Sequence, residues 1–173
     1  MNNIPQSRIR YLRTWTTGPK KAELRSTSES QNTALLDLAS NDYLGLSKHP
    51  EIIAAAKETI DLEGVGAGSS RFITGTRPIH TSLEKELASW LARERVFLFP
   101  SGFQANLAAV IALSNRHTSV IADRLSHYSL LMGIKSSGAK LYRYEHNDVD
   151  NLEKYLKQII RRNPNDRPLV ITE

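Results

Sequence analysis

The sequence predicts an α/β fold with a mostly parallel sheet. From residue 96 onward, short apolar segments alternate with longer segments whose apolar residues recur every three or four positions. This alternation is typical of right-handed β-α-β units. In such sheets, ligands bind beyond the carboxyl ends of the strands. The functional residues are therefore expected in the loops that follow the strands.

The composition is that of an ordinary globular protein, with 40% hydrophobic and 24% charged residues in 173. The absence of cysteine excludes disulfides, thiolate nucleophiles and cysteine-based zinc sites. The net charge is +5, but the basic residues are scattered, so we expect no nucleic-acid partner. The sequence has neither an apolar run of membrane-spanning length nor the apolar core of a signal peptide. These features predict a cytoplasmic protein with no membrane partner.

The first part of the chain is polar and irregular, and it is interpreted as an arm. A short basic helix is predicted at Ile9–Trp15, and a brief strand at Leu35–Ala39. Asn41–Gly45 predicts a tight turn, because Asn and Asp side chains bond to the local backbone and glycine closes the turn. We expect residues 1–45 to form an N-terminal arm and small-domain segment, and residues 46–173 an incomplete large domain.

Two helices should follow the turn. Pro50 suits the first position of a helix that Gly64 ends, and a second helix is predicted at Pro78–Arg93. The glycines of Gly64–Gly68 do not form a dinucleotide-binding fingerprint, since their spacing differs and they follow a helix. A hinge or a substrate-lining loop is the better interpretation of this segment.

The remaining elements alternate in type. In chain order, we expect a strand at Val96–Phe99, a helix at Phe103–Leu113, a strand at Ser119–Ala122, a helix at His127–Ser136, a strand at Lys140–Tyr144, a helix at Val149–Arg162 and a strand at Pro168–Thr172. No helix follows the last strand, which predicts that the chain stops where an active-site loop should begin.

A candidate anion site lies where the strand at 96–99 meets the next helix, in Pro100–Asn106. The first N–H groups of a helix lack internal acceptors and lie at the positive end of its dipole. Gly102 would let a phosphate approach the backbone closely. The alternative is a plain N-cap, in which Ser101 caps the helix and Gly102 only relieves strain.

His127 is the candidate side chain at the carboxyl edge of the sheet, just after the strand at 119–122. A histidine that caps or packs at a helix start is the alternative, and position alone favours it. His80 and His146 are expected to be structural. No pair of histidines has the helical spacing of metal ligands, so we expect no metal site.

Taken together, a series of segments resembles the α-oxoamine synthase family of pyridoxal-phosphate (PLP) enzymes. The resemblance covers roughly residues 35–173 and implies a partial fold-type-I PLP transferase, with an N-terminal arm and the first part of the large-domain sheet. The segments that carry it are, in order, Ser40–Leu46, Gly66–Arg71 with Thr74–Thr76, His80–Glu84, Phe99–Phe103, Asp123–His127 and His146–Asp148.

The resemblance implies a role for individual residues. Gly102 and Phe103 would hold the cofactor phosphate through their backbone amides, and His127 would stack on the pyridine ring as a catalytic residue. Arg13, Asn41 and His127 would contact the substrates. The Schiff-base lysine and the aspartate that pairs with the pyridine nitrogen come later in family chains, so the chain is expected to lack both.

The implied reaction joins an amino acid to an acyl-CoA thioester with loss of carbon dioxide, in a homodimer. Ser40–Leu46 and Asp123–His127 most resemble the branch that forms 8-amino-7-oxononanoate from pimeloyl-CoA and L-alanine in biotin biosynthesis. Arg71–Ile73 keeps the sibling activities open: 5-aminolevulinate synthase, 2-amino-3-ketobutyrate CoA ligase and serine palmitoyltransferase. An inactive remnant that acts by association, as a pseudo-subunit, is the alternative from another class. An unrelated α/β domain is the third interpretation.

The resemblance also has a consequence for folding. In the family's sheet, the strand at Val96–Phe99 would be separated from Ser119–Ala122 by strands that form later in the chain. The resulting edge is exposed and apolar, and such edges aggregate. We therefore expect that this chain by itself neither folds stably nor is active.

Overall fold

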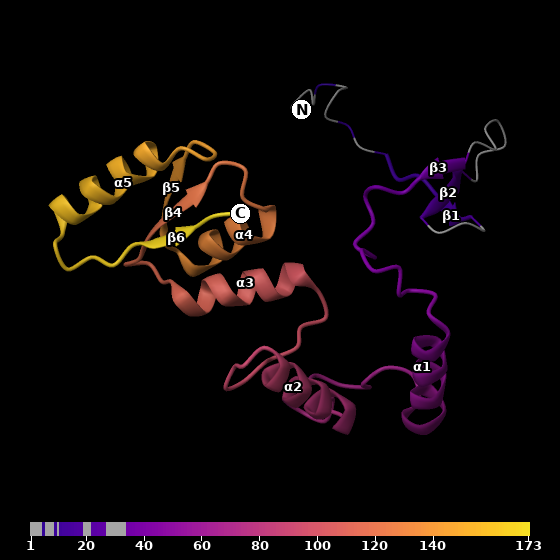
Figure 1. Cartoon of the computed structure of the whole chain (residues 1–173). Coiled ribbons are helices and arrows are strands. Elements are labelled where there is room, and N and C mark those ends of the chain that lie inside the picture. Colours follow the sequence, from indigo (N-terminus) through magenta and orange to yellow (C-terminus); the bar gives the residue numbers. More distant parts are fainter. Residues whose placement is uncertain (1–4, 6–8, 10, 19–21, 27–33) are drawn as a thin grey trace. The chain divides into compact units, whose positions relative to one another are not determined.

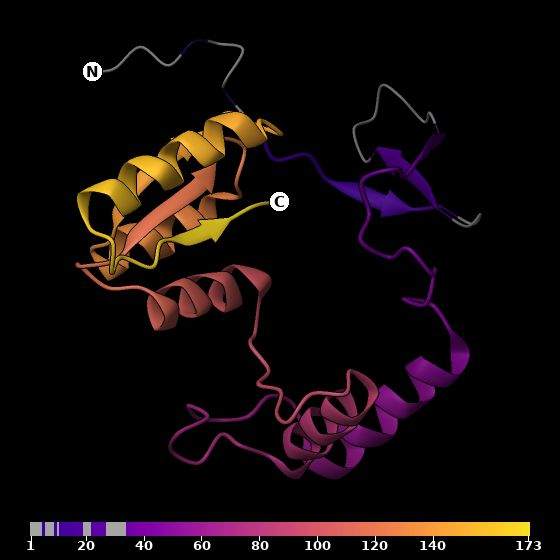
Figure 2. The same ribbon diagram turned by 60° about the vertical axis from the view of Figure 1, so that its left-hand side comes forward.

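The computed structural model describes residues 5, 9, 11–18, 22–26 and 34–173 (Figures 1 and 2). Its contacts group into two compact units, residues 1–68 and 69–173, which are described separately below. The division predicted at residue 45 concerns functional domains and stays a prediction.

The first unit contains a three-stranded antiparallel sheet of order β1-β2-β3. Its strands are β1 (Trp15–Thr17), β2 (Glu23–Ser26) and β3 (Ala34–Leu36). The helix predicted at Ile9–Trp15 is wrong, because Ile9 and residues 11–14 are not helical and Trp15 begins β1. A helix that short is marginal in water, whereas an aromatic and two threonines suit a strand with a partner. The strand predicted at Leu35–Ala39 is present but ends at Leu36.

The turn after this sheet is confirmed. Gly45 has a φ of 65°, and its N–H donates to the carbonyl oxygen of Asp42 at 3.0 Å. The Asp42 carboxylate also accepts the N–H of Leu46 at 2.8 Å. Helix α1 (Pro50–Glu63) then begins at the predicted proline and ends at Gly64, whose φ of 78° requires glycine.

The second unit begins with helix α2 (Pro78–Trp90). His80 Nδ1 accepts the N–H of Arg77 at 3.0 Å, which confirms a structural role for this histidine. The helix ends at Trp90 rather than Arg93, since the chain turns left-handed at Ala92, with a φ of 50°.

The strand predicted at Val96–Phe99 is wrong for the structure described here, which assigns these residues to no strand. A strand needs a partner for its N–H and C=O groups, and no described strand pairs with this segment. Instead, the N–H of Leu98 donates to Glu84 Oε1 at 3.0 Å.

A parallel three-stranded sheet, of order β5-β4-β6, forms the centre of the second unit. The α/β alternation predicted from residue 100 onward is confirmed. The elements are α3 (Gly102–Leu113), β4 (Ser119–Asp123), α4 (Tyr128–Ser137), β5 (Lys140–Tyr144), α5 (Val149–Arg162) and β6 (Leu169–Ile171).

Helices cover both faces of this sheet (Figures 1 and 2). On one face, Val120 and Ala122 of β4 pack with one side chain from α3 and one from α4. On the other face, Ile121 packs with Tyr144 and with Ile159 of α5. Since β5 and β6 lie on opposite sides of β4, right-handed crossovers place α4 and α5 on opposite faces. The carboxyl ends of all three strands therefore share one edge.

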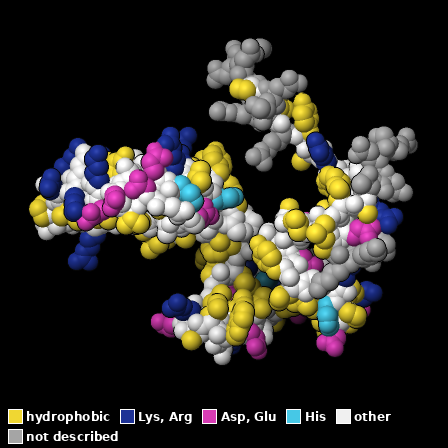
Figure 3. Space-filling view, turned by 45° about the horizontal axis from the view of Figure 1, so that its top comes forward, with side chains coloured by type: hydrophobic (Ala, Val, Ile, Leu, Met, Phe, Trp, Pro, Cys, Tyr) yellow, Lys and Arg dark blue, Asp and Glu magenta, His cyan; other side chains and the backbone are white. Residues whose placement is uncertain are grey.

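Many large hydrophobic side chains remain exposed in the described residues, and the space-filling view shows several of them (Figure 3). Among the helices that the structure describes, none has the length and apolar character to cross a membrane.

Candidate cofactor site

The first turn of α3 presents free backbone donors at the carboxyl edge of the sheet. Ser101 caps the helix, as its Oγ accepts the N–H of Gln104 at 3.3 Å. Gly102 and Phe103 come next, in the turn where helical geometry leaves N–H groups without internal acceptors. A Cβ placed on Gly102 would meet nothing within 4 Å. The cap by Ser101, which was the alternative interpretation of this segment, is present, and it leaves the amides of Gly102 and Phe103 available for an anion.

His127 is the N-cap of α4. Its Nδ1 accepts the N–H of Ser129 at 3.2 Å and lies 2.6 Å from Ser129 Oγ. Its own main-chain N–H donates to the carboxylate of Glu173, just beyond β6. The capping role that position alone favoured is therefore confirmed, but the residue itself remains exposed.

The structure brings three of the predicted site residues together. The rings of Phe103 and His127 lie with their centroids 6.5 Å apart and their planes at 77°, an edge-to-face contact. Gly102 directly precedes Phe103 on α3. The N-termini of α3 and α4 thus meet at the carboxyl edge, where a ligand of an α/β sheet binds.

A buried carboxylate fixes the loop that carries His127. Asp123, at the end of β4, is 1% exposed. Its Oδ1 accepts the N–H of Leu125 at 2.7 Å, and its Oδ2 lies 2.9 Å from His146 Nδ1. The N–H of Leu125 and, to a lesser extent, His146 lower the pKa of Asp123, against the opposing effect of burial. His146 makes the structural contact expected of it.

We predict that Asp123→Asn lowers the free energy of unfolding at neutral pH. We also predict that this free energy then decreases less steeply as the pH is lowered. A carboxylate whose folded pKa is depressed stabilises the fold above its unfolded pKa, and this contribution is lost as pH falls through the folded value. Urea unfolding midpoints measured from about pH 7 to pH 3 check this, in a chimera that joins this segment to the remainder of an enzyme of the resembling family. Asp150→Asn, at an exposed position of α5, is the matched control. If the stability of Asp123→Asn decreased in acid as steeply as that of the unsubstituted protein, the prediction would be wrong.

One further buried group lies beside the site. The hydroxyl of Ser126, which directly precedes His127, is buried and has no hydrogen-bond partner among the described residues. Buried polar atoms without partners are rare in folded proteins. Ser126 therefore adds a polar group that the fold itself leaves unsatisfied next to the candidate site.

The other two predicted site residues, Arg13 and Asn41, belong to the first unit. Asn41 is exposed at the bend before the turn, and Arg13 is exposed in a stretch that is neither helix nor strand. Their contacts with substrate, and that of His127, stay predictions.

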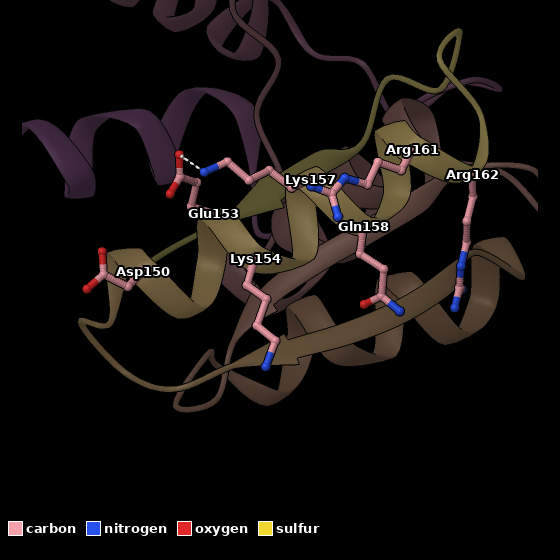
Figure 4. A pocket seen from close by; sticks show the side chains of 7 residues that line it. All are labelled: Asp150, Glu153, Lys154, Lys157, Gln158, Arg161 and Arg162. Carbon is pink, nitrogen blue, oxygen red and sulfur yellow. Dashed lines mark ion pairs between the residues drawn. The ribbon is translucent and has the colours of Figure 1, made fainter.

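The outer face of α5 is a separate, highly charged surface (Figure 4). Acidic residues lie toward its start and basic residues at its end, as the helix dipole favours. Lys157 and Glu153 form an ion pair at 2.7 Å, which is the kind of pair that exposed helices commonly carry. This face therefore needs no ligand to explain its charges. No group of three or more potential metal ligands occurs in the described part of the chain.

Sequence reasoning missed three side chains that build the site. Asp123 begins one of the segments that carry the family resemblance, but no role was predicted for it. Asn106 ends the segment of the candidate anion site, and its Nδ2 donates to Ser129 Oγ at 3.0 Å. Asn106 follows Gly102 by about one helical turn, which is a signal that it shares a face with the anion site. The position of Ser129 after the capping histidine gave no comparable signal.

A parallel sheet with helices on both faces and two helix N-termini at its carboxyl edge defines this chain as an α/β protein. Residues 33–173 match the model of the family "aminotransferase class I and II", and the chain belongs to that family. Its fold is that of a partial PLP transferase of fold type I.

The chain is also similar to individual proteins of known name. The chain is 43% identical over 143 residues to 8-amino-7-oxononanoate synthase of Photobacterium profundum, an alignment that covers 83% of this chain and 36% of the relative. A solved serine palmitoyltransferase of S. paucimobilis with bound PLP and myriocin has a TM-score of 0.80 at 26% identity, covering 91% of this chain and 38% of that one. The 8-amino-7-oxononanoate synthase of Francisella tularensis has a TM-score of 0.58 at 27% identity, covering 77% and 43%. The chain thus spans little more than a third of the length of the curated relative.

Proposed function

We propose that this chain forms the phosphate-binding and ring-stacking part of a PLP-dependent acyltransferase. The proposed reaction condenses pimeloyl-CoA with L-alanine, with loss of carbon dioxide, to give 8-amino-7-oxononanoate for biotin biosynthesis. The observation that carries the proposal is the meeting of the first turn of α3 with His127 at the carboxyl edge of the sheet. The names of the relatives support the choice of reaction.

The residues present fit the phosphate of PLP. The amides of Gly102 and Phe103 point from the positive end of α3, where a dianion is stabilised. The open space in front of Gly102 is what a bound phosphate needs, because any side chain there would fill it. Ser101 does not compete for these amides, since its hydroxyl takes the N–H of Gln104.

His127 suits the flat ring of the cofactor. Its imidazole is anchored at Nδ1 by Ser129, while the residue itself remains exposed. Phe103, also partly exposed, borders it edge-on and would exclude water from one side. When bound, PLP supplies an electron sink for the carbanion formed from the amino acid. The task of this chain is to bind the phosphate and orient the ring.

The remaining parts of the proposal come from the family resemblance. Arg13 and Asn41 would contact the acyl and amino-acid substrates, and the Schiff-base lysine would lie outside residues 1–173. The enzyme would act as a homodimer in the cytoplasm.

A chimera tests the proposal. Residues 33–173 replace the corresponding segment of the P. profundum relative, which supplies the remainder of the enzyme. We expect the chimera to bind PLP and to keep kcat/KM for pimeloyl-CoA and L-alanine within about tenfold of the parent. Loss of PLP binding in a chimera that still folds would refute the phosphate site.

The same chimera separates the alternatives, because only this segment differs from the parent. The structural similarity to serine palmitoyltransferase favours that activity as the second candidate. A shift of preference toward L-serine and palmitoyl-CoA would assign the segment to it. A folded chimera that binds PLP without turnover would support the inactive remnant.

A further inference from the structure

The side chain of Ser129 links two helices at the candidate site. Ser129 is 0% exposed near the start of α4. Its Oγ lies 2.6 Å from His127 Nδ1 and 3.0 Å from Asn106 Nδ2, on α3. A buried hydroxyl between two polar partners has its hydrogen bonds satisfied and a fixed direction. The histidine is therefore tied to the helix whose first turn contains Gly102 and Phe103.

The donors around His127 decide where its proton lies. A main-chain N–H can only donate, and that of Ser129 points at Nδ1 at 3.2 Å. This contact favours a lone pair on Nδ1, and with it a neutral ring whose proton lies on Nε2. The amide nitrogen of Asn106 also only donates, so Ser129 Oγ accepts from it and can turn its own hydrogen toward Nδ1.

We infer that Ser129 and Asn106 are positioning residues that fix the Nε2–H tautomer and the orientation of His127. The inference rests on the proposed function for its consequence, since His127 faces the cofactor ring only in that proposal. The tautomer itself does not depend on any ligand. Together the three side chains couple the phosphate-binding helix to the ring-stacking histidine, so that both parts of the site keep one geometry.

The tautomer is measured directly by nitrogen NMR on protein with ¹⁵N-labelled histidine, assigned through His127→Gln. The protein examined is the chimera, in which the strands of the parent enzyme complete the sheet. We expect a single Nε2–H tautomer at His127 in the unsubstituted protein. In Ser129→Ala, the ratio of Nε2–H to Nδ1–H should fall about tenfold, which is the effect of about one hydrogen bond. Ser129→Thr, which keeps the hydroxyl, should restore the ratio.

Ser137→Ala is the matched control. Ser137 lies on the same helix, and its hydroxyl is 2.9 Å from Ser114 Oγ, just after α3. This substitution also removes a hydroxyl contact between the two helices, but at the end distant in sequence from His127. We expect the tautomer ratio and the Kd for PLP to stay unchanged in Ser137→Ala, whereas Ser129→Ala weakens PLP binding about tenfold.

Two outcomes would overturn the inference: an Nδ1–H tautomer in the unsubstituted protein, or an unchanged ratio in Ser129→Ala. If Ser129→Ala fails to fold, Asn106→Leu removes the same link from α3 and should also lower the ratio. A chimera that does not bind PLP but shows the predicted tautomer shift would refute the proposed function while supporting this inference.

Discussion

Thermal unfolding of the 173-residue chain by itself is expected to show no single cooperative transition. The fully buried side chains of the described residues gather around β4, whereas many large hydrophobic side chains are exposed. Strand β6 pairs with β4 on one side only, and no described strand pairs on its other side. An unpaired strand edge and a small core favour local unfolding and association over an all-or-none transition.

Calorimetry and far-UV circular dichroism check this expectation, with the chimera as the control. In the chimera, the remaining strands of the parent enzyme should complete the sheet, and a cooperative transition should return. A sharp transition in the isolated chain, with calorimetric and van't Hoff enthalpies that agree, would contradict the prediction.

The helices were predictable because their signals are local. Helix α5 carries Asp148 at its N-cap, apolar residues on one face and two arginines in its last turn, and its bounds agree with the prediction. Helix α1 was equally clear from a proline at its start and a glycine after its end. In both cases, the residues that decide the structure lie within the element itself.

Strands depend on partners that a local pattern does not contain. Val96–Phe99 is as apolar as β4, but it has no described strand beside it and forms none. In contrast, β1 was missed, because its few residues become a strand only through pairing with β2. The parallel strands β4 and β5 were found since the helices on either side marked their limits, and β6 since α5 precedes it.

The candidate site was predicted in position but not in its connections. Gly102 and His127 were singled out where an expected strand is followed by a helix, at the edge of a parallel sheet where ligands bind, and Phe103 was added by the family resemblance. The contact of Asn106 with Ser129 joins residues 23 positions apart and exists only because α3 packs against α4. No spacing within the sequence reports which residues of two packed helices will face each other.

The packing of α3 against α4 leads to the second large effect: Gly133→Val should destabilise the fold by about 3 kcal/mol, through overpacking. Gly133 is a buried residue of α4 that lies against α3. A Cβ added there would stand 2.7 Å from Val110 Cβ and 3.2 Å from the carbonyl oxygen of Leu107. Both neighbours belong to the body of α3 and not to the end of a flexible side chain, so the helices would have to move apart.

Substitutions of graded size separate this effect from helix propensity. Gly133→Ala gains about 1 kcal/mol of helix propensity, so a net loss of stability in this variant would come from the contact with α3. Val110→Gly removes the opposing Cβ, and combining it with Gly133→Ala should recover about 1 kcal/mol or more relative to the sum of the single effects. Urea unfolding of the chimera measures each free energy.

Ser136→Val is the control for Gly133→Val, since Ser136 is exposed on the same helix. It should change stability by no more than about 0.5 kcal/mol. Because the spacing of α3 and α4 also sets the distance from Phe103 to His127, Gly133→Ala should weaken PLP binding even where the protein remains folded. Equal stability for Gly133→Val and Ser136→Val would show that the two helices can separate without cost, and the close contact would then have no part in holding the site.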